Sequence, residues 1–310
     1  MASNEPQGGI LPEPPESALF LILNAGDRTR DGRALAKALA RVPELTRRLA
    51  RSEPRARLRS VVGVGPALWD AVSPGLRPRG FRAFPALEAG DLRAPATGGD
   101  LLLHLVARRA DLCFELALRA RRELGDAASV LEEVHGFRYL DSRDLTGFID
   151  GTENPKGRER AAVALLGRED PAFAGGSFVF TQRYVHDLAK WGGLTLREQE
   201  AAIGRRKRDS RELSARAKPP TAHIARTVIE EDGAELEIVR YSLPYGTSSE
   251  CGLFFIAYTK DLSIPEQMLR RMLGASGDGR HDRLMEFTRA VSGATFFAPP
   301  LRLLRSLGAS

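Results

Sequence analysis

The chain has 310 residues, of which 43% are hydrophobic and 28% charged, which is the composition of a soluble globular protein with one large domain or two ordinary ones. No apolar run approaches the length that spans a membrane, and residues 1–7 lack the basic start and apolar segment of a secretory signal, so we expect a cytoplasmic protein with no membrane partner. The net charge of +6 is the excess of 46 basic over 40 acidic residues, and because the two signs are interspersed it does not indicate a nucleic-acid partner.

The first half of the chain predicts a β-α-β-β-α-β order. A proline-rich stretch up to about Pro15 is expected to form a loose arm before the first strand. The predicted strands are residues 18–24, 57–63, 101–107 and 132–139, and the predicted helices are residues 31–50 and 110–124. Pro43 lies inside the first helix, where a proline is expected to cause a break or a kink.

The second half repeats this order. Strands are predicted at residues 177–184, 234–242 and 252–258, helical segments up to about residue 216, and a helix at residues 262–273. Ser263 and Glu266 have the spacing of a capping box, and Gly274 follows the end of that helix. We therefore predict an α+β fold of two ferredoxin-like units, residues 1–140 with the arm and residues 141–310, in which antiparallel sheets pack under helices and leave a cavity for a flat cofactor.

The most informative motif is the loop of residues 147–155, Gly-Phe-Ile-Asp-Gly-Thr-Glu-Asn-Pro. It holds a single aspartate, Asp150, between glycines that permit unusual backbone angles and the close approach of a flat ligand. The Asn-Pro pair that ends the motif favours a turn. This pattern indicates either a carboxylate directed at a ligand or an ordinary surface turn with a capping aspartate.

Two further residues follow this loop in a recognisable order. His223 lies after a Pro-Pro pair, and Arg240 lies near the end of a strand-like run that leads into Leu-Pro-Tyr-Gly. Together with the aspartate loop, and with shorter motifs in order from residues 9–12 to residues 296–299, this arrangement resembles the dye-decolorising peroxidase family of haem enzymes, in its cytoplasmic bacterial type. The resemblance implies a dimeric α+β barrel type of fold, a homo-oligomer, and one haem b per chain held mainly by the second half.

The resemblance implies His223 as the ligand of the haem iron. A haem iron in a peroxidase needs one neutral imidazole, and the sequence has five histidines. Without the resemblance, His223 could equally be a partly exposed histidine after a turn. Asp282 is implied as the carboxylate that accepts the second imidazole N–H, although its position before residues 284–287 also suits a helix N-cap. Haem attachment is expected to be non-covalent, because the two cysteines lack the Cys-x-x-Cys-His pattern.

On the other face of the haem, the resemblance implies Asp150 and Arg240. Peroxide cleavage needs a group that moves a proton between the two oxygens, and a fixed positive charge beside the developing anion. A carboxylate and a guanidinium suit these two roles, although Arg240 could also be a surface charge at a strand end. Ser242 stands where some relatives carry an asparagine, which puts activity towards metal ions in question.

The resemblance also implies contacts with the rest of the cofactor. Arg205 is the implied partner of a haem propionate, and Thr152, Glu153 and Asn154 are expected to line the haem edge. Phe255 could pack on the haem or belong to the core. The basic segment 205–216, interrupted by acidic residues, is otherwise interpreted as a solvated helix face.

The predicted function is a haem-dependent peroxidase that reduces hydrogen peroxide and oxidises dyes, phenols or other small reducing substrates by one-electron steps. Surface electron transfer would involve Trp191, Tyr245 or Tyr258. Two alternatives are a haem-binding protein for haem handling or iron release, and a basic module that binds an acidic partner through residues 205–216. The tail of residues 303–308 faintly resembles peptides that dock such enzymes in protein nanocompartments, but it is short and lacks a flexible spacer, so packaging is not expected.

Overall fold

The structure is a computed structural model that describes residues 4–309. Its first half forms a four-stranded antiparallel sheet in the order β6-β1-β5-β2. The bounds are β1 (Ser17–Ala25), α1 (Arg28–Ser52), β2 (Arg59–Val64), α2 (Pro66–Val72), β3 (Leu87–Ala89), β4 (Leu92–Ala94), β5 (Leu101–Ala107), α3 (Ala110–Leu124) and β6 (Ala128–Phe137). This is the ferredoxin-like strand order that the sequence predicts.

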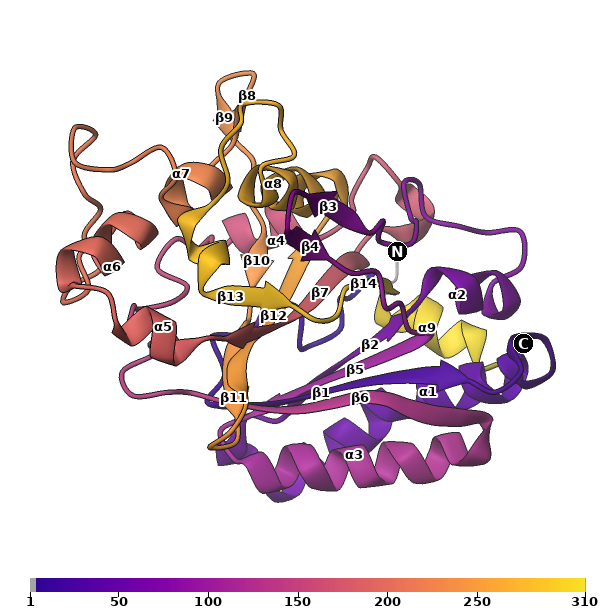
Figure 1. The fold of residues 1–310 in the computed structure, drawn as a ribbon. Coiled ribbons are helices and arrows are strands. Elements are labelled where there is room, and N and C mark those ends of the chain that lie inside the picture. The colour runs from indigo at the N-terminus through magenta and orange to yellow at the C-terminus, as the bar shows by residue number, and fades with distance from the viewer. Residues whose placement is uncertain (1–3, 310) are drawn as a thin grey trace.

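The second half builds the same strand order, β11-β12-β7-β14. Its strands are β7 (Ser177–His186), β8 (Glu230–Glu231), β9 (Ala234–Glu235), β10 (Val239–Arg240), β11 (Leu243–Gly246), β12 (Cys251–Thr259), β13 (Thr288–Ala290) and β14 (Ala294–Ala298). Its helices are α4 (Glu159–Ala164), α5 (Leu188–Gly192), α6 (Leu196–Ile203), α7 (His223–Thr227), α8 (Ser263–Leu273) and α9 (Leu301–Leu307). Figure 1 shows α1 and α3 below the strands of the first half, with α7 and α8 on the far side of the molecule.

The two sheets join at both edges and so form a barrel. β11 pairs with β6 through Tyr245 and Gly136, and β14 pairs with β2 through Phe297 and Val64. The interior of this barrel is a core to which both halves contribute, including Phe20 of the first half. A second core, which includes Trp69, lies between the first sheet and its helices. Apolar residues cover both faces of β1, β2 and β5, which explains why these strands are almost continuously apolar in the sequence.

α1 continues through Pro43, so of the two outcomes expected there the break does not occur. Three other local predictions are wrong. Residues 205–216 form turns and not a helix, and residues 234–242 form two short strands, β9 and β10, instead of one long strand. The capping box of α8 does not form, because Glu266 pairs with Arg82 and Arg270 and therefore does not cap the helix. In the last case Glu266 is engaged by the distant Arg82 and by Arg270, one turn further along the same helix, in place of the cap.

The N-terminal arm is anchored and not loose. The Gln7 side chain donates to the carbonyl oxygens of Val62 and Pro299 and accepts the Val62 N–H, at distances of 2.8–3.0 Å. Ile10, three residues later, is fully buried in the barrel core. Long-range hydrogen bonds therefore replace the regular structure that prolines exclude. Within residues 4–309, we find no helix whose length and apolar character would allow it to cross a membrane.

Candidate functional site

A cavity of about 240 Å³ lies on the outer face of β7 and β12. Alternate residues of β12 point in opposite directions, so Leu253 and Phe255 line this cavity while Phe254 and Ile256 belong to the barrel core. Helices α7 and α8 cover the cavity, and the loop that contains Asp150 forms part of its wall. The cavity thus lies between a sheet and helices, where the sequence predicts a space for a flat cofactor.

The cavity brings most of the predicted site residues together. Its lining includes Asp150, Thr152, Glu153, Arg205, His223, Arg240, Ser242 and Phe255. Asn154 and Asp282 lie behind this lining. Both are buried, and each binds a residue that reaches the cavity. Much of the remaining lining is apolar and comes from α8 and the segment after α7.

His223 is the first residue of α7, and its side chain is held from behind by Asp282. Its Nδ1 lies 2.6 Å from Oδ2 of Asp282, whose side chain is fully buried. A buried carboxylate accepts a hydrogen bond, so Nδ1 carries the proton and the lone pair of Nε2 is left free. The second oxygen of Asp282 accepts the backbone N–H of Leu284. Asp282 is therefore both the partner of His223 and a helix cap, so the two interpretations of this residue are compatible.

Arg226 fixes α7, a helix of a single turn, to the end of α8. The residue is 3% exposed, and its guanidinium pairs with Asp278 and donates to the Arg271 carbonyl oxygen and the Ser276 hydroxyl. A helix this short has little stability of its own, so such tertiary contacts determine where it lies. This buried cation lies one turn after His223 and holds its helix in place.

The Asp150 loop takes its shape from the flanking glycines. Gly147 and Gly151 have φ angles of 89° and 72°, which side-chain-bearing residues rarely adopt. The Asp150 N–H donates to the Ser142 carbonyl oxygen, and its Oδ1 accepts the Gly151 N–H at 2.6 Å. One carboxylate oxygen is thereby held, and Oδ2 is left for a ligand. The structure places the Asp150 side chain at the cavity lining, and its role towards a ligand stays a prediction.

Asn154 connects the Asp150 loop to the strand that carries Arg240. Its Nδ2 donates to the Arg240 carbonyl oxygen at 2.6 Å, and its Oδ1 accepts the Arg240 N–H at 2.9 Å. The side chain therefore occupies the position of a neighbouring strand and satisfies both backbone groups of Arg240. Asn154 does not itself line the cavity. It fixes the position of the Asp150 loop relative to Arg240, and both of these residues do line it.

Arg205 lies at the cavity with its side chain 13% exposed. It donates to the Ser210 carbonyl oxygen at 2.8 Å and to Oε1 of Glu153 at 2.8 Å. The Glu153 side chain is 63% exposed, so this ion pair is a weak one that a buried anion in the cavity could replace.

Several polar residues of β7 belong to the cavity although the sequence motifs did not indicate them. Gln182, Tyr184 and His186 all line the cavity, because alternate residues of this strand face it. Nε2 of His186 lies 3.3 Å from Oδ1 of Asp144, another lining residue. Burial alone would raise the pKa of Asp144, but its hydrogen bonds with His186 and Thr146 lower that pKa. The period-two pattern of residues 180–186 is the signal that could have found these residues.

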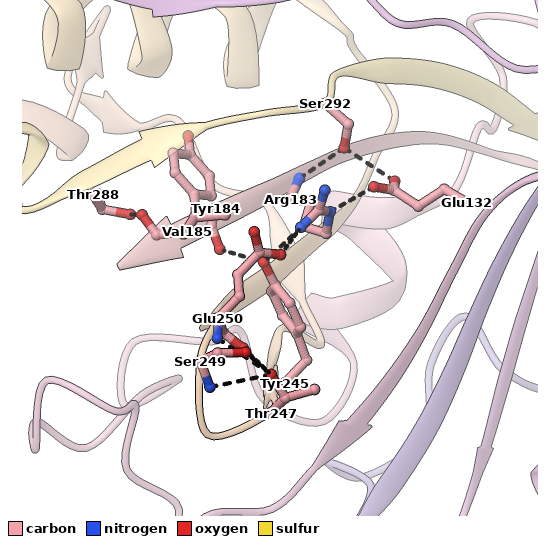
Figure 2. Close-up of polar contacts among 10 residues, drawn as sticks. All are labelled: Glu132, Arg183, Tyr184, Val185, Tyr245, Thr247, Ser249, Glu250, Thr288 and Ser292. Carbon is pink, nitrogen blue, oxygen red and sulfur yellow. Dashed lines mark hydrogen bonds and ion pairs between the residues drawn. The ribbon is translucent and has the colours of Figure 1, made fainter. Parts of the chain in front are cut away.

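The aromatic candidates for surface electron transfer are all buried. Trp191, Tyr245 and Tyr258 are 4%, 8% and 0% exposed, so none of them is a surface residue. Figure 2 shows how Tyr245 is held: its hydroxyl accepts a hydrogen bond from Arg183 at 2.9 Å and donates to the Tyr184 carbonyl oxygen at 3.1 Å. The rings of Trp191, Tyr245 and Tyr258 fill hydrophobic cores instead. A single sequence does not show whether such a residue is buried or exposed, because its ring is apolar and its tip is polar.

Comparisons with known proteins match both halves of the chain. Residues 7–138 match the family model of the N-terminal part of Dyp-type peroxidases, and residues 141–303 match that of the C-terminal part. The chain belongs to the Dyp-type peroxidase family. A dye-decolorizing peroxidase of Mycolicibacterium paratuberculosis is 43% identical over 97% of this chain and 85% of its own. The predicted family and the predicted peroxidase function are confirmed.

Solved structures extend this agreement to the fold. DyPB from Rhodococcus jostii RHA1 superposes with a TM-score of 0.94 at 42% identity, covering 99% of this chain and 100% of its own. This likeness confirms the predicted α+β fold. The encapsulated DyP-type peroxidase from Mycobacterium smegmatis also has a TM-score of 0.94, at 38% identity over 98% of both chains. From the short C-terminal tail we predicted no packaging in a nanocompartment. This relative, which is encapsulated, contradicts that prediction.

Proposed function

We propose that this protein is a haem-dependent peroxidase that reduces hydrogen peroxide and oxidises dyes, phenols or other reducing substrates one electron at a time. Membership of the Dyp-type peroxidase family carries this conclusion. A variant of the Rhodococcus jostii protein, 42% identical to this chain, forms a complex with haem. The cofactor predicted from the sequence, one non-covalent haem b, is supported by the same relationship.

The residues at the cavity suit this cofactor. His223 offers an Nε2 lone pair, and the fully buried Asp282 on its other nitrogen increases its basicity as a ligand. Much of the wall is apolar, as a porphyrin ring requires, and Arg205 supplies a cation for a propionate. Thr152, Glu153, Ser242 and Phe255 complete the proposed haem surroundings. When bound, haem supplies the iron that accepts the two oxidising equivalents of peroxide.

Asp150 and Arg240 are the proposed residues of the peroxide reaction. The free Oδ2 of Asp150 takes a proton from one peroxide oxygen and returns it to the other, which leaves as water. The permanent positive charge of Arg240 stabilises the anion that develops during this transfer, since a guanidinium stays protonated. Asn154, which binds the Arg240 backbone from the same loop, is the proposed link between the two.

A role in haem handling without turnover is not favoured. Storage of haem has no need for a proton-transfer carboxylate beside a fixed cation. Nor is a basic interaction module favoured, because Arg205 lines the cavity and pairs with Glu153, and Arg206 pairs with Asp209, so both are already engaged within the molecule.

The first experiment is a stopped-flow absorbance measurement on haem-loaded protein mixed with one equivalent of hydrogen peroxide. We expect a rapid shift of the Soret band, followed by its recovery when a phenol or dye is added. Slow bleaching without such a shift would contradict the peroxidase proposal and would support haem handling.

Replacing Asn154 by alanine is expected to slow the peroxide reaction by about 10- to 100-fold, the usual consequence of a small misplacement of catalytic groups. The change removes both hydrogen bonds to the Arg240 backbone while Asp150 and Arg240 remain. Asn154→Asp keeps an acceptor for the Arg240 N–H but loses the donor, so its rate should lie between those of the alanine variant and the wild type. Equal rates in all three proteins would mean that this link does not position the site.

Replacing Arg205 by leucine is expected to weaken haem binding by about 10- to 100-fold, which corresponds to the loss of one charge-assisted hydrogen bond. Haem titration by absorbance measures this change. Arg206→Leu is the matched control, because Arg206 is the next residue and its partner is Asp209 at the surface. Equal affinities of the two variants would remove Arg205 from the proposed cofactor contacts.

We also propose that the chain divides at residues 140 and 141, and that the protein is cytoplasmic. β6 ends at Phe137, and the two family models meet in the same region. Cys113 and Cys251 are free thiols, which suits a reducing compartment. Limited proteolysis tests the first proposal, and cell fractionation tests the second.

A further inference from the structure

A buried tyrosine and a buried histidine bind each other inside the barrel. Oη of Tyr258 lies 2.7 Å from Nδ1 of His104, and both residues are fully buried. Phe20 stacks on the imidazole with ring centroids 5.0 Å apart, and Tyr241 contacts the phenol ring edge-on at 5.9 Å. The peroxide chemistry described above uses neither residue, and two polar groups in such a core need a physical reason.

The hydrogen bond has a defined direction. Nε2 of His104 is buried and has no hydrogen-bond partner among residues 4–309. If Nδ1–H donated to Tyr258, the phenol O–H would also be left without an acceptor, which would make two unsatisfied groups. If Tyr258 donates to Nδ1, only the Nε2–H is unsatisfied, at a cost of about 1–3 kcal/mol. The second arrangement is the favoured one, so the phenol proton already points at an unprotonated nitrogen.

This pair is close to the cavity. Tyr258 lies on β12, the strand whose outer face carries Phe255 at the cavity wall. Its neighbour Ala257 pairs in register with Arg240, a residue of the proposed peroxide site. The phenol therefore lies on the inner face of a strand whose outer face lines the cavity, and no second layer of secondary structure intervenes.

We propose that Tyr258 is a redox-active tyrosine: it transfers an electron to the oxidised active site, and His104 holds its proton until the electron is returned. After hydrogen peroxide has oxidised the site, the Tyr258 phenol gives up one electron to it, and its O–H proton moves to Nδ1 of His104. The products are a neutral phenoxyl radical and an imidazolium. A reducing substrate later returns one electron to the radical, and His104 returns the proton to the phenol oxygen.

The surroundings suit this step. A phenol that has lost an electron is a strong acid, and the Tyr258 proton already points at Nδ1 of His104 at 2.7 Å, so the proton moves along an existing hydrogen bond as the electron leaves. Burial lowers the pKa of His104 to about 3, so the imidazole is neutral at rest and its Nδ1 lone pair is available. Burial likewise raises the pKa of Tyr258 well above its ordinary range, so the phenol keeps its proton until it is oxidised.

The test is rapid-freeze electron paramagnetic resonance of haem-loaded protein after one equivalent of hydrogen peroxide, without reducing substrate. We expect a tyrosyl radical whose spectrum narrows when the protein is made with ring-deuterated tyrosine. Tyr258→Phe keeps the ring and should lose the signal. His104→Gln keeps an acceptor but no base, and should also lose it or form it more slowly. Tyr241→Phe is the matched control that should keep it.

The proposal rests on the peroxidase function, and the same samples separate the two. If the Soret band does not respond to peroxide, the peroxidase function fails. If the band shifts as in the wild type but the radical is absent, survives in Tyr258→Phe, or disappears in Tyr241→Phe instead, the redox role of Tyr258 is wrong. Equal haem content in each variant confirms that the substitutions leave the fold intact.

Discussion

Asp150→Asn is expected to slow the reaction with hydrogen peroxide by about 10²- to 10⁴-fold, the usual contribution of a positioned acid–base group. Asparagine has nearly the same shape and can still accept the Gly151 N–H, so the loop should keep its conformation. What it lacks is a second oxygen that can take a proton and return it. The measurement is the second-order rate constant of the Soret change under stopped-flow conditions.

Arg240→Leu is the partner experiment, with an expected loss of about 10²- to 10³-fold for removal of a fixed charge from the site of a developing anion. Arg240→Lys is the control that keeps the charge but not its shape, and it should lie between leucine and the wild type. The backbone of residue 240 remains bound by Asn154 in every variant, which separates charge from position. If Asp150→Asn and Arg240→Leu both react at the wild-type rate, the proposed roles are wrong.

His223→Leu is expected to abolish tight haem binding and also to destabilise the haem-free protein by about 1–3 kcal/mol. The second effect arises because Asp282 is fully buried and loses the hydrogen bond from Nδ1 of His223. Its remaining bond, from the Leu284 N–H, does not compensate a buried carboxylate. Urea unfolding of the haem-free variants measures this change, and haem titration measures the first.

The double variant His223→Leu with Asp282→Asn distinguishes charge from packing. Asparagine removes the uncompensated charge and can still accept the Leu284 N–H, so part of the lost stability should return while haem binding stays lost. Asp282→Asn alone should keep haem but weaken its binding by about 10- to 100-fold, as expected for the partner of a ligating histidine. If His223→Leu leaves the free energy of unfolding of the haem-free protein unchanged, the hydrogen bond from His223 does not stabilise the buried Asp282 carboxylate.

The roles of Asn154 and Asp282 show where sequence reasoning stops. The family resemblance implied that Asn154 lies at the haem edge with Thr152 and Glu153, and its actual partner is the Arg240 backbone, 86 residues further along the chain. Asp282 and His223 are 59 residues apart, and only their contact shows that capping and ligand support can be combined in one carboxylate. Residues adjacent in a motif need not face the same way.

The sequence by itself determined the features that depend on neighbouring residues: the turn of the Asp150 loop, which needs glycine at 147 and 151, the end of α8 at Gly274, and the strand and helix order that predicts the family's fold. Only the tertiary structure decided the barrel closure, the side of β7 that faces the cavity, and the burial of Tyr258 beside His104. Backbone preferences and capping act over a few residues, whereas burial and pairing depend on which distant surfaces meet when the two sheets close.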